Sequence, residues 1–234
     1  MKPQTELLII DGLEVQVTRK KIKNSYLRIC HQTGLIRLSI PHSLRQNQVD
    51  NFIRSKRTWI DKHVEQINQK PQLPTYHYLS GEFHPYQGEL YQLKLISSNL
   101  TNSVKIDYEN KLLVMKIKGE LNIENKKRLL TEWYRAQFKQ QLPVLIQKWE
   151  QVIGVESQDW GVRQMRTRWG TCNTQSKKIW LNLELIKKPI ICLEYVLVHE
   201  LVHLLERKHN KVFYAYMSEY MPDWKDYDQL LKNA

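Results

Sequence analysis

Apolar side chains recur with two different periods along this chain. Through residues 1–120 they fall at every second position, as in Leu13–Val17 and Ile36–Ile40. A period of two is typical of strands that bury one face. From Asn122 onward the apolar spacing becomes helical. We therefore expect an α+β fold, with a β-rich N-terminal lobe at residues 1–120 and a second domain at residues 121–234.

One helix is expected inside the N-terminal lobe. Apolar residues after Ser43 follow helical spacing as far as Ile67, and Ser43 can cap the first turn. Residues 69–74 have the composition of a linker. Strands resume over residues 91–118, with a turn at Glu109-Asn110.

A long apolar stripe over residues 129–149 predicts a backing helix for the second domain. Pro143 lies inside this stripe, and proline removes a helical hydrogen bond, so we expect a kink or a split there. Gly154 is the expected end of the helix. Strands at residues 157–165 and 178–185 then predict a small antiparallel sheet. No internal repeat is visible in the sequence.

The segment His199-Glu200-Leu201-Val202-His203 carries the most specific chemistry. It lies in an apolar run that predicts a buried helix opened by Pro189. Residues four apart share a helix face, so His199 and His203 can offer two imidazoles to one Zn²⁺, with Glu200 beside them as a general base. The alternative is a helix with two structural histidines, but burying two imidazoles and a carboxylate without partners is costly.

His209 can join this pair only if the helix stops. Six further helical residues would turn the chain through about 600° and point His209 away. We therefore expect the helix to end near Leu205-Glu206. Because Glu206–Lys208 contains no Gly or Asn, one of its residues should take a positive φ. Asn210 is expected to start the next helix.

Several segments of the C-terminal third follow one another in a characteristic order. They are Arg166–Asn173, Ile179–Asn182, Pro189, Tyr195–His203, His209-Asn210, Phe213 and Met221–Asp223. This order resembles the YgjP-like metal-dependent hydrolase family, a zincin relative of the SprT-type metallopeptidases, and the resemblance extends from about Gly12 onward. Thr171 departs from the pattern, because relatives often carry Ser there.

The resemblance implies a zincin-like catalytic domain over residues 121–234. In it, His199, His203 and His209 would hold one zinc ion, or another divalent cation, and Glu200 would be catalytic. Members of the family are called peptidases by fold, and a UTP pyrophosphatase activity has been proposed for them. The resemblance thus defines the site more closely than the substrate.

Composition favours a soluble globular protein, since 41% of the residues are hydrophobic and no run is long enough to span a bilayer. The N-terminus lacks the layout of a signal peptide. We therefore expect a cytoplasmic protein without a membrane partner. The three cysteines are widely spaced, which argues against a disulfide framework.

The charge balance changes the picture of possible partners. There are 36 Lys and Arg against 24 Asp and Glu, a net charge of +12. This excess favours anionic partners such as nucleotides or nucleic acid. Because the basic clusters are short and scattered, a solvated basic surface is an equal alternative.

Four side chains are candidates for contact with the substrate. Hydrolysis needs a donor for the developing oxyanion, and Arg168, Tyr195 and Tyr214 are the candidates in that order. Arg166 and Arg168 flank the loop expected beside the metal, where two guanidiniums could hold phosphates. Ordinary surface arginines are the alternative.

Three further residues close to the motifs have simpler interpretations. Cys172 is expected to be a small buried cysteine rather than a nucleophile or a ligand. Asn182 and Asp223 either orient a histidine or serve as turn and cap residues.

Taken together, these features predict a zinc-dependent hydrolase, foremost a metallopeptidase that uses metal-activated water. A peptide would pair with an edge strand near Ile179–Glu184. One alternative is a nucleoside triphosphate (UTP) pyrophosphohydrolase, favoured by the charge and the arginine-rich loop. Another is a nucleic-acid-associated SprT-like protease. Glu200 argues against a module that binds metal without catalysis.

Overall fold

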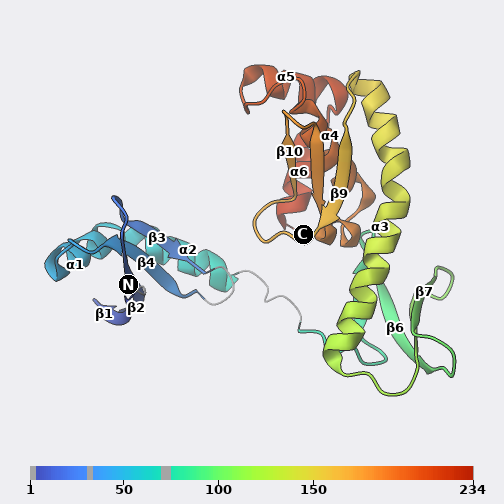
Figure 1. Cartoon of the computed structure of the whole chain (residues 1–234), viewed down its shortest axis with the longest axis horizontal. Coiled ribbons are helices and arrows are strands. Elements are labelled where there is room, and N and C mark those ends of the chain that lie inside the picture. The colour runs from blue at the N-terminus through green and yellow to red at the C-terminus, as the bar shows by residue number, and fades with distance from the viewer. Residues whose placement is uncertain (1–3, 31–33, 70–74, 234) are drawn as a thin grey trace. The chain divides into compact units, whose positions relative to one another are not determined.

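The computed structural model describes residues 4–30, 34–69 and 75–233, which form two compact units at residues 1–75 and 76–234 (Figure 1). This division differs from the predicted boundary at residue 120. The second group of strands packs into the same core as the long helix that follows it, so it belongs to the second unit. The predicted linker at 69–74 lies mostly outside the described residues.

The first unit consists of a four-stranded sheet and two helices. The strands are β1 (Gln4–Ile10), β2 (Leu13–Lys20), β3 (Tyr26–Ile29) and β4 (Ile36–Pro41), in the order β1-β2-β4-β3. The helices are α1 (Gln46–Ser55) and α2 (Arg57–Gln69). The single helix predicted here is divided at Lys56, whose N–H bonds to the Ile53 carbonyl and closes α1 with a tight turn. Apolar residues of the sheet and both helices form a core of their own.

The second unit begins with another four-stranded sheet. Its strands are β5 (Phe83–Tyr86), β6 (Glu89–Ser97), β7 (Ser103–Asp107) and β8 (Leu112–Ile117), in the order β5-β6-β8-β7. Both sheets use the same sequence of pairings: antiparallel, parallel, antiparallel. Their first hairpins even turn on equivalent residues with positive φ, Asp11-Gly12 and Gln87-Gly88. The fold therefore contains a repeat that the sequence does not show.

The long helix α3 (Ile123–Ile153) is capped by Asn122 and ends at Gly154, in a left-handed conformation. The expected split at Pro143 does not occur. Pro143 and Lys139, whose carbonyl loses its helical donor, are both exposed. Water can therefore satisfy that carbonyl, and the helix continues.

A small sheet and three helices complete the second unit. The strands are β9 (Asp159–Arg163), β10 (Gly170–Asn173) and β11 (Lys178–Asn182), in the order β10-β11-β9. They are followed by the 3₁₀ helix η1 (Leu183–Lys187), α4 (Ile190–Val202), α5 (Lys211–Tyr220) and α6 (Trp224–Asn233). Within the described residues, none of the helices is long and apolar enough to cross a membrane.

This small sheet corrects two predictions. It is mixed rather than antiparallel, because β9 runs parallel to β11. The predicted loop supplies a third strand, β10, which pairs antiparallel with the other side of β11. The strand expected at the edge is therefore central, and β10 is the edge strand that contacts α4. The expected strand also stops at Asn182, whose side chain accepts the Glu184 N–H and starts the 3₁₀ turn.

Candidate metal centre

Helix α4 carries His199 and Glu200 and places them among buried side chains. Pro189 stands directly before its first residue, as expected. The helix ends at Val202, slightly earlier than predicted. Its last turn is a narrower 3₁₀-type turn, in which the N–H of Leu204 bonds to the carbonyl three residues back, that of Leu201, at 2.9 Å.

The positive φ predicted within Glu206–Lys208 is wrong, since none of the three is among the left-handed residues of the described chain. The turn is made by a side chain instead: the Glu206 carboxylate accepts the Lys208 N–H at 2.9 Å. Asn210 starts the next helix, as predicted, by accepting the N–H groups of Val212 and Phe213. This short turn brings His209 back over α4.

The three predicted histidines come together. Ligand nitrogens of His199, His203 and His209 all lie within 4.8 Å of one another. The Nε2 atoms of His199 and His209 are 2.9 Å apart, where two lone pairs repel unless a proton or a cation lies between them. The buried ring of Phe213 packs against all three imidazoles, with centroid distances of 4.9, 4.7 and 4.7 Å. This cluster fits one metal ion, with Phe213 as its apolar support.

The surroundings of His199 and His203 favour the neutral imidazole that metal ligation requires. Burial, reinforced by His203 and His209, lowers the pKa of His199 to about 4. Burial also lowers the pKa of His203. The Nδ1 of His203 is 3.2 Å from the Glu206 carbonyl, a bond that leaves its Nε2 free for a metal.

Glu200 is buried beside this cluster, with only 6% of its surface exposed. Burial raises the pKa of its carboxyl to about 8, and the charge of Arg168 acts in the opposite direction. Strand β10 approaches it closely, because a β-carbon placed on Gly170 would lie 2.6 Å from Glu200 Oε1. The backbone of the edge strand is therefore pressed against the carboxylate.

Of the two candidate arginines, only Arg168 is brought near Glu200. Its loop is fastened by Asn182, which donates to the carbonyls of Arg168 (2.9 Å) and Met165 (3.1 Å). Arg166 is exposed, and no interaction in the described chain ties it to the histidines or to Glu200. Asn182 thus positions the arginine loop rather than a histidine.

The two candidate tyrosines have different surroundings. Tyr195 is buried, and its hydroxyl donates to Asp228 at 3.2 Å while its ring meets His199 edge-on. It therefore supports His199 from behind and is not open to a substrate, contrary to its predicted role. Tyr214 is 41% exposed and stacks beside His209 with ring centroids 6.3 Å apart. It lies at the surface of the metal centre.

Sequence reasoning missed Asp228, which accepts from Tyr195 and whose charge acts on His199. Asp228 sits in an amphipathic helix where acidic residues are common, so no local pattern distinguishes it.

Within the described chain, two further predicted residues form no hydrogen bond with the histidines. Asp223 bonds to Tyr227. Cys172 is half-buried, and burial together with Glu200 raises the pKa of its thiol to about 11, so it stays protonated at neutral pH.

Comparisons with known proteins identify the family. The chain matches the family model described as YgjP-like, metallopeptidase domain, over residues 23–234. No curated protein matches it. Among solved structures it is similar to the crystal structure of the metallopeptidase zymogen of Pyrococcus abyssi abylysin, with 18% identity and a TM-score of 0.36, over 38% of this chain and 91% of that one. Because the family match spans most of the sequence, the chain belongs to the YgjP-like metallopeptidase family.

Proposed function

We propose that this chain is a zinc-dependent peptidase whose metal is held by His199, His203 and His209, with Glu200 as the general base. The observation that carries the proposal is the meeting of three imidazoles beside one buried carboxylate. Three imidazole ligands are typical of catalytic rather than structural zinc, because they leave a coordination position open. A zinc ion in such a site supplies Lewis acidity that makes water a nucleophile near neutral pH.

Glu200 has the environment that a proton carrier needs. Burial holds its pKa near 8, and the positive charge of Arg168, like that of any bound cation, lowers it. Its carboxylate can therefore take a proton from water at neutral pH and release it to the leaving amine. Arg168 and the exposed Tyr214 are the two remaining candidates to stabilise the oxyanion.

The edge strand β10 suggests how a peptide binds. On the side away from β11, Gly170–Asn173 pairs with no other strand in the described chain. An extended peptide can add there by backbone hydrogen bonds. Because Gly170 touches Glu200, this pairing brings the peptide backbone to the base. The edge strand of the proposal is thus β10, in place of Ile179–Glu184.

The substitution Glu200→Gln tests the base. An amide cannot accept the proton, so peptide turnover should fall about a thousandfold while bound metal and fold persist. Glu194→Gln is the matched control, because it removes a carboxylate from the same helix without touching the histidines. Normal turnover by metal-replete Glu200→Gln protein would remove Glu200 from the mechanism.

Metal content tests the ligand set, and a substrate screen tests the class. His203→Ala should reduce bound zinc, measured by elemental analysis of the purified protein, to a small fraction of the wild-type amount.

The substrate screen has two arms. In the first, the zinc-loaded enzyme should cleave unfolded proteins and peptides. Nucleoside triphosphates form the second arm, and their hydrolysis without any peptide cleavage would overturn the peptidase proposal.

A further inference from the structure

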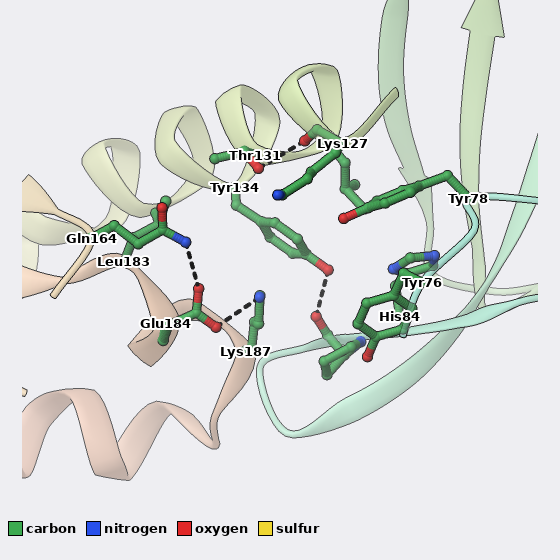
Figure 2. Close-up of a pocket in the computed structure, with 12 residues that line it drawn as sticks. Tyr76, Tyr78, His84, Lys127, Thr131, Tyr134, Gln164, Leu183, Glu184 and Lys187 are labelled. Atoms are coloured by element: carbon green, nitrogen blue, oxygen red, sulfur yellow. Dashed lines mark hydrogen bonds and ion pairs between the residues drawn. The ribbon is translucent and has the colours of Figure 1, made fainter. Parts of the chain in front are cut away.

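The second unit contains a cavity that the proposed chemistry does not use. It has a volume of about 70 Å³ and lies between β5, α3 and η1 (Figure 2). Its principal lining residues are Tyr76, Tyr78, His84, Lys127, Tyr134 and Lys187. It is separate from the metal centre, since η1 lies at the start of α4 and about 13 Å of helix separates Ile190 from His199.

Tyr78 is held in this cavity at a conformational cost. Its φ of 56° is in the left-handed region, which an aromatic residue rarely adopts. The Glu82 carboxylate fixes it by accepting the N–H groups of His77 (3.0 Å) and Tyr78 (2.7 Å). Backbone strain of this kind is concentrated at functional sites.

The strained conformation presents a hydroxyl without a partner. Tyr78 is only 9% exposed, and Figure 2 shows its hydroxyl directed into the space above Tyr134. No group in the described chain forms a hydrogen bond with that oxygen. The Tyr134 hydroxyl, in contrast, already donates to the Pro85 carbonyl at 2.7 Å. A hydroxyl without a protein partner that faces a cavity is available for a ligand.

Two ammonium groups add positive charge to the same cavity. Lys187 is bound to Glu184 at 2.7 Å and lies 5.5 Å over the Tyr134 ring. Lys127 extends into the cavity from α3, and its nearest carboxylate, Glu124, is 3.8 Å away. Each ammonium has three donors, so both retain N–H groups that no carboxylate uses.

The balance of groups selects the class of ligand. Glu184 is the one carboxylate among the lining residues, and it pairs with Lys187. Two other carboxylates act on Tyr78: Glu82 accepts the Tyr78 N–H, and Glu124 is 3.8 Å from the Lys127 ammonium. Aromatic walls can also enclose a ligand cation. Here Lys187 occupies the face of Tyr134, and Lys127 would repel a second cation.

We propose that this cavity binds a small oxyanion, a carboxylate or a phosphate group, through the Tyr78 hydroxyl and the ammonium groups of Lys127 and Lys187. The side chain of Lys127 is 53% exposed and provides the opening to solvent. The stacked rings of Tyr76 and His84, 4.4 Å apart, form the apolar wall against which the rest of the ligand packs.

Calorimetric titration of the metal-loaded protein tests this site, with sodium phosphate and sodium acetate as the two probes. Saturable binding of one probe identifies which oxyanion the cavity accepts. Lys127→Ala should weaken that binding about ten- to a hundredfold, because it removes a charge-assisted hydrogen bond. Tyr78→Phe keeps the ring and removes only the hydroxyl, so it should weaken binding about threefold to tenfold.

Lys139→Ala is the matched control, because Lys139 is an exposed lysine of the same helix and does not line the cavity. It should bind the probe like the wild type. Three outcomes overturn the proposal. One is an absence of saturable binding for both probes. Another is unchanged affinity in Lys127→Ala and Tyr78→Phe, which would place the anion elsewhere, at the metal for example. The third is an equal loss in Lys139→Ala, which would reveal unspecific attraction to the basic surface.

Discussion

The sheet of residues 4–41 and the sheet of residues 83–117 share one plan, including its register. Gln16 pairs with Leu7 and Arg37 in the first sheet, and Gln92 pairs with Phe83 and Leu112 in the second. Core positions correspond in the same way. Buried Leu38 in β4 has its equivalent in buried Leu113 in β8.

The two sheets differ in what covers them. The first packs with α1 and α2 into a core that belongs to its own unit. The second shares its core with α3, η1 and α4, the helix that carries His199. The same backbone plan therefore serves once within an independent unit and once as the base of the unit that carries the three histidines. Because the strand order is the same in both sheets, the difference lies in the side chains that each sheet presents to the helices packed on it.

The equivalent leucines provide the largest test of this comparison. Leu38→Ala and Leu113→Ala each remove a fully buried side chain, so each should lower the free energy of unfolding of its own unit by about 2–5 kcal/mol. Only Leu113→Ala should make the protein release zinc at lower urea concentration. Urea unfolding followed by tryptophan fluorescence, with a chromogenic chelator to detect zinc, measures both effects. If both variants release zinc equally early, the two cores are not independent.

Substitutions of the two equivalent hairpin glycines should differ by a smaller amount in the free energy of unfolding that they cost. Gly12→Ala and Gly88→Ala both place a side chain at positive φ, which costs about 1 kcal/mol. At Gly12 the new β-carbon meets nothing within 4 Å, whereas at Gly88 it lies 2.8 Å from Pro189 Cγ. Gly88→Ala should therefore lose about 1–3 kcal/mol more. Equal losses in urea unfolding would show that the hairpin moves away from Pro189 without cost.

The smallest expected difference depends on pH. His84 occupies the position that Leu8 holds in the first sheet, and burial lowers its pKa below the ordinary 6.5. Below pH 6.5 this histidine takes up a proton in the unfolded chain, whereas in the folded chain its lowered pKa keeps it neutral. The free energy of unfolding should thus fall as the pH drops from 6.5 through the folded pKa.

His84→Leu introduces the residue of the first sheet and should reduce this acid sensitivity. Urea unfolding at pH 7.5 and 5.5 measures it in both proteins. All other titratable groups are the same in wild type and variant, so their contributions cancel in the comparison. An identical loss of stability on acidification in the two proteins would contradict a role for His84.

The sequence was most informative where a local pattern implies a local structure. The spacing of His199 and His203 specifies one helix face, and Asn210 is a capping residue by its chemistry, so both predictions hold for the geometry. The meeting of His209 with that pair also followed, because only a chain reversal could bring it there. The means of the reversal did not follow, since Glu206 uses its side chain in place of a left-handed residue.

Predictions failed where distant contacts decide. Pro143 was expected to kink or split its helix, but the helix runs on through it, because the exposed Lys139 carbonyl can bond to water instead. The short strand β10 was taken for a loop, because four residues carry little periodicity without their partner β11. Tyr195 looked like a substrate ligand in sequence, yet its hydroxyl is committed to Asp228, a residue of another helix.

Gly170 limits which positions can be substituted to change the substrate preference of this enzyme. A β-carbon there would come within 2.6 Å of Glu200 Oε1 and 2.9 Å of Val196 Cγ1, so any other amino acid displaces the Glu200 side chain. A saturation library across the edge strand should return glycine alone at this codon. Variation is open at Thr171, whose side chain alternates to the opposite face. Substitutions that change substrate preference therefore have to be sought at other positions of the edge strand, because Gly170 has no room for a side chain.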